Sequence, residues 1–376
     1  MPCALITGAS GQDGSFLTEY LLDKGYKVFG MVRRSSNMTN LDRLSAVRSH
    51  PRLSIQYGDV TDAPSVVRIV NMAYNDPCRA GSPLEIYNLA AQSHVRVSFD
   101  VPVYTAQSDA IGVLNVLEAV VQLPDHSPGA VRLYQASTSE LYGCTPGPQD
   151  ESTLMQPQSP YAVAKLYAYW IVINYRKIYG GFFVNGILFN HESERRAENF
   201  VTRKITQYVA RRAVHKISTP LRIGNVHARR DWGYARDYVE AMHMMLQHQV
   251  PEDFVVATGG CHTVKEFVDA AFACVGTTVD WKGSGAEEFA VDRIVVDSDT
   301  ASKCQKQRGG RPMATGVQTR AGFFEADFVV AAGDYHHMVR LKTLDTTLCV
   351  CMRENACTAC FFFLSCSICL YVCLFS

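Results

Sequence analysis

Residues 1–189 alternate short apolar runs with longer segments in which apolar residues recur at helical spacing. This alternation is typical of repeated strand–helix–strand units, whose strands lie parallel in one sheet. Six apolar runs that end in polar or small residues are predicted strands: Cys3–Thr7, Lys27–Val32, Leu53–Tyr57, Glu85–Leu89, Val131–Ser137 and Phe182–Leu188. The pattern predicts an α/β fold with a Rossmann-type, doubly wound parallel sheet, in which ligands bind beyond the carboxyl ends of the strands.

The pattern loosens after Phe189 into a polar, basic segment that we assign to a smaller α/β substrate-binding lobe. Apolar periodicity then predicts a helix over Tyr234–Gln247, a strand near Phe254–Thr258 that rejoins the main sheet, and a helix over Thr263–Val275. We expect the lobe to be incomplete at its C-terminus. The Rossmann domain is predicted to comprise residues 1–189 and about 234–260. The substrate-binding lobe is predicted to comprise residues 190–233 and 261–300, and residues 301–376 form a divergent tail.

Composition and charge exclude several function classes. The 376 residues include 36 basic and 36 acidic side chains, so no global field attracts nucleic acid or an anionic membrane. The N-terminus lacks the basic and apolar regions of a secretory signal, so we expect a cytoplasmic protein. Of the 13 cysteines, those scattered along the chain are expected to be core thiols. The cysteines clustered near the C-terminus lack the spacing and the histidine partners of a zinc site.

A glycine-rich loop follows the first predicted strand and consists of Gly8, Ala9, Ser10, Gly11, Gln12, Asp13 and Gly14. Glycine lets the backbone turn tightly and approach a pyrophosphate, which then lies at the positive N-terminus of the following helix. Strand, loop and helix in this order favour a dinucleotide-binding site over a plain structural turn.

The second predicted strand runs into Arg33, Arg34, Ser35 and Ser36. An NAD-specific protein usually has an acidic residue here for the ribose hydroxyl, whereas two guanidinium groups and two hydroxyls suit a 2′-phosphate. We therefore expect NADP as the cofactor; the alternative is a solvated basic turn. Asp59, after the third strand, is placed either to meet the adenine or to cap the next helix.

Acid–base chemistry is expected from Tyr161 and Lys165, which are four residues apart. Ser159 and Pro160 precede them as a helix cap and a first helical residue, so the phenol and the ammonium share one helical face. A neighbouring cation lowers a tyrosine pKa towards neutrality. The phenol then becomes a usable base for a hydroxyl proton as hydride leaves the same carbon.

A carboxylate is predicted beside this pair. The strand over Val131–Ser137 leads directly into Thr138, Ser139 and Glu140, which places a hydroxyl and a carboxylate at the ligand-binding edge of the sheet. A simple dehydrogenase or epimerase needs only the tyrosine and hydride exchange, whereas a carboxylate permits removal of a proton from a second carbon. Glu140 therefore favours dehydration; the alternative is that it caps the turn before Tyr142.

Further runs complete a family pattern, namely Ile86–Val95, Gln135–Gly143, Ser159–Tyr161 with Lys165–Trp170, Asn185–Ser193, Asn199–Lys204 and Arg230–Gly233. With the glycine loop and the arginine pair, they resemble the extended short-chain dehydrogenases/reductases and, within them, the GDP-mannose 4,6-dehydratase family. The resemblance covers residues 3–275 and is highly specific because the matching runs are long.

This resemblance implies a lyase with bound NADP that converts GDP-mannose to GDP-4-keto-6-deoxymannose in GDP-fucose and deoxyhexose biosynthesis. Thr138, Glu140 and Tyr161 would be catalytic, together with Lys165. Hydride from C4 would pass to NADP⁺, Glu140 would remove the C5 proton as the C6 hydroxyl leaves, and hydride would return to C6. Besides the loops already named, the implied cofactor-binding residues are Val60, Leu89, Ala90, Ala91, Gln92, Ser93, Tyr104, Lys165, His191 and Arg196.

The resemblance also implies contacts with the substrate and with other subunits. Residues expected near the GDP-sugar are Ser93, Asn190, Lys204, Arg222 and Arg230, for which a solvated basic face is the alternative. The family's tetramer would give the loop over Arg33–Arg43 an interface role, so we expect a homo-oligomer, either a dimer or a tetramer.

The resemblance ends after Val279, where the family's Arg-Pro-Glu segment, lysine-containing helix and tryptophan-containing closing motif are not found. Residues 357–376 form an uncharged run, rich in cysteine and phenylalanine, that is close to the length of a membrane span. Membrane contact is expected only if this run is native. A span usually has flanking basic residues, so our preferred hypothesis is that the tail is a displaced reading frame or a mispredicted end.

Three functional hypotheses follow from the sequence. The first is the dehydratase; the second is another nucleotide-sugar dehydratase or a 4-epimerase, which Glu140 and the run Asn199–Lys204 disfavour. The third is an inactive homologue that binds cofactor or partner subunits, motivated by the incomplete lobe. The presence of Thr138, Tyr161 and Lys165 favours an active enzyme over an inactive homologue.

Overall fold

The computed structural model describes residues 1–35, 38–124, 129–215 and 220–283, and beyond them the strands over 289–290, 294–296, 317–319, 322–324, 338–343 and 346–351. Its centre is a seven-stranded parallel sheet with the order β11-β6-β5-β4-β1-β2-β3. The strands are β1 (Cys3–Thr7), β2 (Lys27–Val32), β3 (Leu53–Tyr57), β4 (Leu84–Asn88), β5 (Val131–Ala136), β6 (Phe182–Leu188) and β11 (Phe254–Val256). The predicted Rossmann-type sheet is confirmed, with β4 shifted by one residue and β5 and β11 shorter than expected.

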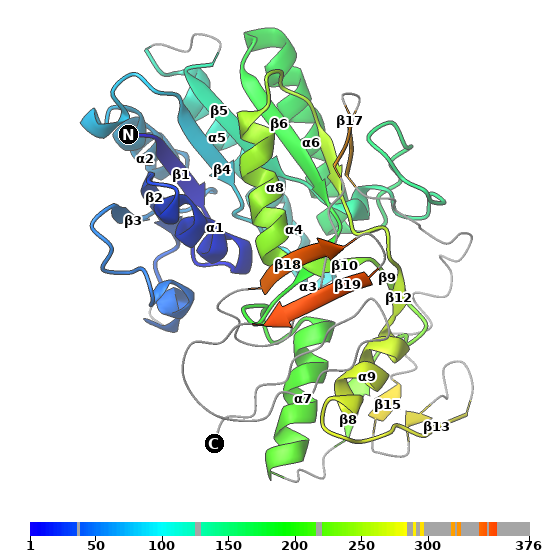
Figure 1. The fold of residues 1–376 in the computed structure, drawn as a ribbon. Helices are drawn as coiled ribbons and strands as arrows, with labels where there is room; N and C mark the ends of the chain where they lie inside the picture. The colour runs from blue at the N-terminus through cyan, green and yellow to red at the C-terminus, as the bar shows by residue number, and fades with distance from the viewer. Residues whose placement is uncertain are drawn as a thin grey trace.

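Helices cover both faces of this sheet (Figure 1). Because side chains alternate along a strand, Ala4 and Ile6 pack on one face with α1 (Gln12–Asp23) and α8 (Ala235–Gln247). Cys3 and Leu5 pack on the opposite face with the remaining layer, α2 (Ala63–Tyr74), α5 (Gly112–Val121) and α6 (Pro160–Tyr179). A ligand therefore has access at the carboxyl ends of the strands.

Helix α6 carries Tyr161 and Lys165 and begins as its sequence predicts. The Ser159 hydroxyl accepts a hydrogen bond from the amide of Ala162 at 3.1 Å, and Pro160 occupies the first helical position. The short connecting elements are η1 (Met38–Leu44), η2 (Pro77–Arg79), α3 (Val95–Asp100), α4 (Pro102–Ala106), the π-helical turn η3 (Gln107–Ile111) and η4 (Ser139–Leu141). All of these except η2 contribute residues to the site described below.

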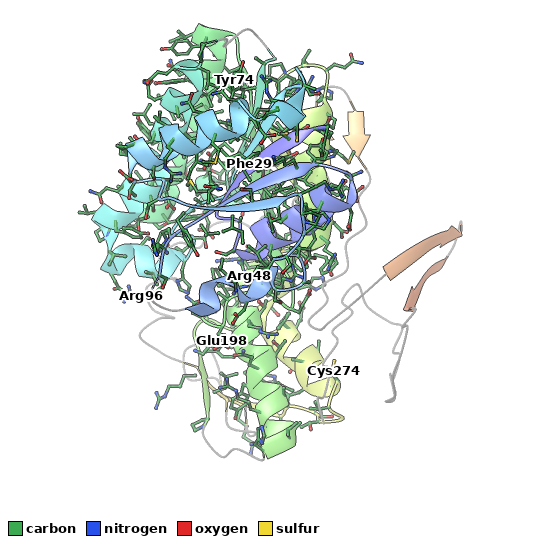
Figure 2. All side chains as sticks on the ribbon, turned by 90° about the vertical axis from the view of Figure 1, so that its left-hand side faces the viewer. Phe29, Arg48, Tyr74, Arg96, Glu198 and Cys274 are labelled. Carbon is green, nitrogen blue, oxygen red and sulfur yellow. The ribbon has the colours of Figure 1, made fainter. Side chains whose placement is uncertain are left out.

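A smaller lobe lies below the carboxyl edge of the sheet, as Figure 2 shows from the side with Glu198 and Cys274 in the lobe and Phe29 in the sheet. Its apolar core joins α7 (Val201–His215) to α9 (Val264–Ala273). A four-stranded sheet completes it, in the order β13 (Trp281–Lys282), β14 (Phe289–Ala290), β15 (Ile294–Val296) and β8 (Leu221–Ile223). These strands extend the lobe past Val279, where apolar periodicity indicated no further element.

The two lobes are connected by paired strands and by one buried carboxylate. Strands β7 (Asn190–Glu192) and β10 (Trp232–Tyr234) pair in parallel, and β9 (Arg229–Arg230) pairs with β12 (His262–Thr263). Between β9 and β10, Asp231 accepts hydrogen bonds from the amides of Thr258 (3.0 Å) and Gly259 (2.8 Å). The segment between β9 and β10 is therefore fixed to the end of β11.

The C-terminal part of the chain contributes two antiparallel pairs to the described residues. They are β16 (Val317–Thr319) with β17 (Gly322–Phe324), and β18 (Met338–Thr343) with β19 (Thr346–Cys351). The apolar run 357–376, for which we considered a membrane span, lies outside the described residues. Among the helices that are described, none combines the length and the apolar character needed to cross a bilayer.

Candidate active site

Most of the predicted site residues line one cleft of about 2040 Å³. It lies beyond β1, β4 and β5, where the strand order reverses, and its opposite wall comes from residues 195–201 and 223–230. Ligand pockets commonly enclose about 300–1000 Å³. The cleft therefore has room for a dinucleotide and a second ligand of nucleotide size.

The glycine loop forms one end of the cleft, and its geometry requires glycine. Gly8 has a φ of 67°, in the left-handed region that favours glycine. A Cβ at Gly14 would lie 2.3 Å from the carbonyl oxygen of Gly8. Helix α1 begins directly after Gly11, so its positive N-terminus opens on the cleft. Six residues of the predicted loop line the cleft: Gly8, Ser10, Gly11, Gln12, Asp13 and Gly14.

The basic run after β2 lies at the mouth of the cleft. The Arg33 guanidinium donates to the Tyr104 hydroxyl at 2.5 Å, and the Arg34 guanidinium lies 5.4 Å from the centroid of the Tyr57 ring. Ser35 also lines the cleft, whereas Ser36 lies outside the described residues. Two exposed cations thus stand beside the place where an adenosine ribose would lie.

Asp59 and Val60 line the same end of the cleft. The Asp59 carboxylate accepts hydrogen bonds from the amide and the hydroxyl of Thr61, both at 2.9 Å. It therefore orders the turn that leads to α2, although Asp62, not Asp59, occupies the N-cap of that helix. The carboxylate keeps accepting capacity towards the cleft.

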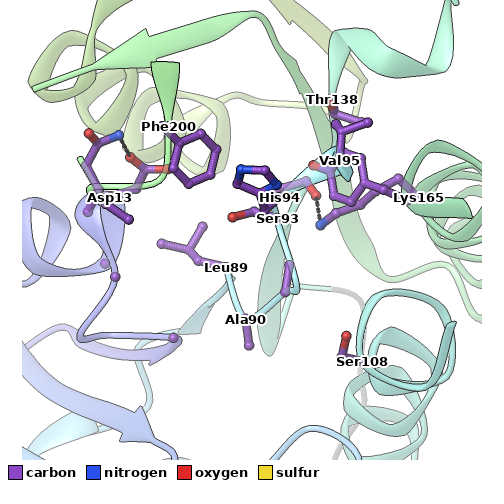
Figure 3. Close-up of a pocket in the computed structure, with 18 of the residues that line it drawn as sticks. Asp13, Leu89, Ala90, Ser93, His94, Val95, Ser108, Thr138, Lys165 and Phe200 are labelled. Atoms are coloured by element: carbon purple, nitrogen blue, oxygen red, sulfur yellow. Dashed lines mark hydrogen bonds between the residues drawn. The ribbon is translucent and has the colours of Figure 1, made fainter. Parts of the chain in front are cut away.

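The loop after β4 forms the floor of the cleft. The Thr7 hydroxyl accepts the amides of Leu89 and Ala90, each at 3.0 Å, which ties this loop to β1. Leu89 and Ala90 lie below Ser93 and His94 in Figure 3, and Ala91 lines the cleft with them. The Gln92 side chain instead bonds the backbone of His94 and is not among the described residues that line the cleft.

The four predicted catalytic residues all line the cleft, and Figure 3 shows two of them, Thr138 and Lys165, on the same side of it. Thr138 follows β5, and its hydroxyl accepts a hydrogen bond from the amide of Glu140 at 3.2 Å. The cap of this turn is therefore Thr138 and not Glu140. No hydrogen bond to the Glu140 carboxylate is found among the described residues, and this side chain lines the cleft. Lys165 donates to the carbonyl of Ala136 at 3.1 Å.

The expectation that Lys165 lowers the Tyr161 pKa is wrong for these residues. Burial, together with the negative charges of Asp109 and Glu140, raises the pKa of Tyr161, while the Arg196 cation lowers it. The Lys165 ammonium lies 5.9 Å from the centroid of the Tyr161 ring and is bound to a backbone carbonyl. Burial also lowers the pKa of Lys165, which weakens the cation that sequence reasoning relied on.

His191 reaches the glycine loop from the opposite wall. Its Nε2 lies 2.9 Å from the Asp13 carboxylate, and its ring stacks on Tyr238 with centroids 4.4 Å apart. Burial by itself raises the pKa of Asp13, but the charge of His191 and its hydrogen bond outweigh burial and lower it. Burial lowers the pKa of His191, and Asp13 reverses this, so the His191 pKa is raised. The two shifts describe a charged pair that joins the loop to β7.

This pair predicts a window of pH in which it stabilises the fold. The stabilisation that Asp13 contributes is fully present above its ordinary pKa of 3.8 and is lost as the pH falls through its lowered pKa in the folded protein. The stabilisation that His191 contributes is fully present below its ordinary pKa of 6.5 and is lost as the pH rises through its raised pKa in the folded protein. We expect Asp13→Asn to lower the unfolding temperature most between those two pH values. Exposed Asp100→Asn is the control, and a deficit that is constant with pH would contradict the assignment.

The substrate-side predictions divide into residues that face the cleft and residues that do not. Ser93, Asn190 and Arg230 line it. Lys204 instead donates to the carbonyl of Arg222 at 2.5 Å, and neither is among the described residues of the cleft wall. The structure thus brings three of the five predicted residues to the cleft.

A stack of three side chains closes the opposite wall, and of these the sequence analysis assigned Arg196 but not His94 or Phe200. The rings of His94 and Phe200 lie 5.0 Å apart between centroids, and the Arg196 guanidinium lies 3.8 Å over the Phe200 ring. Arg43 ties this wall to the glycine loop, because it donates to the carbonyls of Arg195 (2.8 Å) and Ser10 (3.4 Å). The available signals were that His94 lies within the family-like run Ile86–Val95 and Phe200 within the family-like run Asn199–Lys204.

Comparison with known proteins is consistent over most of the chain. The model of the GDP-mannose 4,6 dehydratase family matches residues 5–316, further than the 3–275 expected from the sequence. The GDP-mannose 4,6 dehydratase of Drosophila melanogaster is 52% identical over 348 residues, covering 86% of this chain and 85% of the relative. That of Homo sapiens is 51% identical over 292 residues (76% and 75%), and GDP-mannose 4,6 dehydratase 1 of Arabidopsis thaliana is 51% identical over 322 residues (82% and 85%).

Solved structures share the fold at lower identity. A dTDP-glucose 4,6-dehydratase from Bacillus anthracis in complex with NAD has a TM-score of 0.61 at 22% identity, covering 82% of this chain and 90% of that one. A Thermus thermophilus UDP-glucose 4-epimerase complex with NAD has a TM-score of 0.60 at 23% identity, covering 81% and 93%. The family model matches most of this chain, and the relatives are about half identical to it in sequence. This chain therefore belongs to the GDP-mannose 4,6-dehydratase family.

Proposed function

We propose that this protein is an NADP-dependent 4,6-dehydratase that converts GDP-mannose to GDP-4-keto-6-deoxymannose. The observation that carries the proposal is the Glu140 carboxylate in the same cleft as the Tyr161 phenol. Epimerisation needs one acid–base group and hydride exchange, whereas dehydration also needs a base at a second carbon. The names of the fly, human and plant relatives support the choice of GDP-mannose.

The residues of the chain divide the chemistry among them. Tyr161 takes the proton of the C4 hydroxyl, and the Thr138 hydroxyl lowers the pKa of that phenol and so favours its ionised form. The ketone formed at C4 acidifies the C5 proton, which Glu140 removes and delivers to the C6 hydroxyl, so that water leaves. A bound nicotinamide cofactor would supply the hydride transfer from C4 and back to C6, and the proton held by Tyr161 would then return to C5.

The cofactor end of the cleft fits a dinucleotide. A Cβ at Gly14 would collide with the Gly8 carbonyl, so glycine is needed for the two backbone segments to pack this closely. This close packing leaves room for a pyrophosphate at the N-terminus of α1. We propose that Leu89, Ala90 and Tyr104 line the path of the cofactor and that His191 and Arg196 close it from the opposite wall. The sugar would then lie between Ser93 and Glu140, with Asn190 and Arg230 towards the GDP.

Arg34→Ala is expected to raise the KM for NADP by about 10–100-fold, because one charge-assisted hydrogen bond contributes about 1.5–3 kcal/mol. The guanidinium is exposed at the cleft mouth and lies over Tyr57, a position suited to a 2′-phosphate. Binding of NAD, which lacks that phosphate, is expected to change little. Titrating both cofactors measures the ratio, with exposed Arg48→Ala (labelled in Figure 2) as the control. Equal losses for both cofactors would count against NADP preference.

We further propose that the protein is a homo-oligomer. Val163, Tyr167 and Trp170 follow each other at helical spacing on α6 and are 56%, 39% and 56% exposed. Phe99 and Val103, on the adjacent α3 and α4, are 54% and 70% exposed. An apolar face of this kind commonly marks an interface between subunits. Sedimentation at several concentrations distinguishes a monomer, a dimer and a tetramer.

We also place the protein in the cytoplasm. The cysteines in the described residues form no disulfide, which supports a reducing compartment. The 36 basic and 36 acidic residues give no global attraction to an anionic membrane. Fractionation of cells followed by detection of the native protein tests this assignment.

One assay separates the competing functions. The purified protein is offered GDP-mannose and other nucleotide sugars with NADP, and the products are followed by mass. Loss of one water from GDP-mannose supports the proposal, and a product of unchanged mass indicates an epimerase. Bound cofactor without any turnover would indicate the inactive homologue.

A further inference from the structure

A buried carboxylate behind the cleft wall has no role in the chemistry described so far. Glu192 is the last residue of β7, and its side chain is 6% exposed. It is not among the described residues that line the cleft. Glutamate is rarely buried to this extent unless it is paired, so its partners indicate what it does.

The Glu192 carboxylate has two partners on the segment that follows β7. Its Oε2 accepts a hydrogen bond from the hydroxyl of Thr202, in the first turn of α7. The same oxygen lies 3.2 Å from Nε of Arg196, whose side chain is 16% exposed. This second contact is an ion pair and not an aligned hydrogen bond. Because both side chains are largely shielded from water, salt screens their attraction little, and the pair restrains the guanidinium.

The Arg196 guanidinium also packs on an aromatic ring. It lies 3.8 Å from the centroid of the Phe200 ring, and the rings of Phe200 and His94 lie 5.0 Å apart between centroids. Figure 3 shows His94 and Phe200 side by side. His94 is itself held, because it is the N-cap of α3 and its Nε2 lies 3.3 Å from the carbonyl oxygen of Asn199. A chain of contacts thus runs from Glu192 through Arg196 and Phe200 to the start of α3.

This arrangement leaves the N–H groups of Arg196 for a ligand. A guanidinium has five donors, and among the described residues none accepts a hydrogen bond from this one. Arg196 lines the cleft. A planar guanidinium suits phosphate oxygens, and a side chain that is held before the ligand arrives loses less entropy on binding.

We propose that Glu192 is a positioning residue that holds the Arg196 guanidinium on Phe200, in the orientation that binds the cofactor. The inference rests on the proposed function, in which Arg196 closes the path of the cofactor. Since Glu192 does not line the cleft, it acts through Arg196, and its effect on cofactor affinity disappears when Arg196 is removed. The sign of the effect is also specific. A direct field of the carboxylate would repel the cofactor phosphates, whereas positioning of Arg196 strengthens their binding.

Glu192→Gln tests this, because glutamine keeps the size and an acceptor for the Thr202 hydroxyl and removes the charge. The Kd for NADPH, titrated into the full-length protein, is expected to rise about tenfold, the lower end of what a hydrogen bond to a charged group contributes. In an Arg196→Ala background, the same substitution is expected to change the Kd by less than about twofold.

Glu198→Gln is the matched control, because it removes a negative charge from the same segment without touching Arg196. Glu198 is exposed, as its label in Figure 2 helps to locate, and it accepts a hydrogen bond from Gln207 at 2.9 Å, which glutamine can also accept. We expect its Kd for NADPH to equal that of the wild type.

An equal loss of affinity with and without Arg196 would show that Glu192 only supports the fold and would overturn the proposal. Unchanged or tighter binding by Glu192→Gln would overturn it too, as would wild-type affinity in Arg196→Ala. If Glu192→Gln does not fold, Glu192→Asp replaces it in the same pair of backgrounds, since aspartate keeps the charge and withdraws it by one methylene. Wild-type protein that binds NADPH but does not dehydrate GDP-mannose refutes the proposed function, and the titrations still decide the role of Glu192.

Discussion

Replacing Glu140 with glutamine is expected to slow the loss of water from GDP-mannose by about 10²–10⁴-fold, the usual contribution of a positioned base. Glutamine has the same size, and the described residues make no hydrogen bond to the carboxylate, so the cleft and its affinity for NADP should persist. Oxidation at C4 depends on Tyr161 and continues. The reduced cofactor is therefore expected to accumulate, which its absorbance reports, while mass spectrometry reports the missing dehydration.

Glu240→Gln provides the matched control, because Glu240 is exposed on α8 and lies outside the cleft. It should dehydrate GDP-mannose at the wild-type rate. If Glu140→Gln also turned over normally, Glu140 would have no part in C5 deprotonation, and the argument for a dehydratase over an epimerase would lose its main support.

Tyr161→Phe is expected to reduce turnover by a similar factor, about 10²–10⁴-fold, but at an earlier step. Without the phenol, nothing takes the C4 hydroxyl proton, so neither ketone nor reduced cofactor forms. The ring is 7% exposed and phenylalanine keeps its packing, so the fold and cofactor affinity should be retained. Single-turnover absorbance distinguishes this variant from Glu140→Gln, because only the latter accumulates reduced cofactor.

Tyr179→Phe controls for loss of a hydroxyl on the same helix, since Tyr179 ends α6 and is 43% exposed. Reduced cofactor appearing in Tyr161→Phe at the wild-type rate would assign the C4 proton to another group. Thr138, which lines the same cleft, would then be the first candidate.

Several elements were predictable because their signals are local. Strands β1, β2, β3 and β6 have the predicted bounds. The inner strands β1, β2 and β6 form continuous apolar runs because both faces of the sheet are covered, whereas β3 is an edge strand and is only partly buried. Helix α6 begins where the Ser159 cap and Pro160 place it. The strands β13 to β15 were missed because they are two or three residues long and carry no periodicity.

By itself, the sequence determined the Rossmann-type sheet, the glycine loop and the presence of Glu140, Tyr161 and Lys165, because turn geometry, apolar periodicity and helical spacing act over a few residues. Only the tertiary structure decided the electrostatics of the site. The Tyr161 pKa rises through burial and the field of Asp109, which is more than fifty positions away in the sequence. The pairing of Asp13 with His191 and the outward position of Lys204 depend equally on contacts between distant segments. Burial and charge fields arise only when such segments pack together, so local sequence patterns do not predict them.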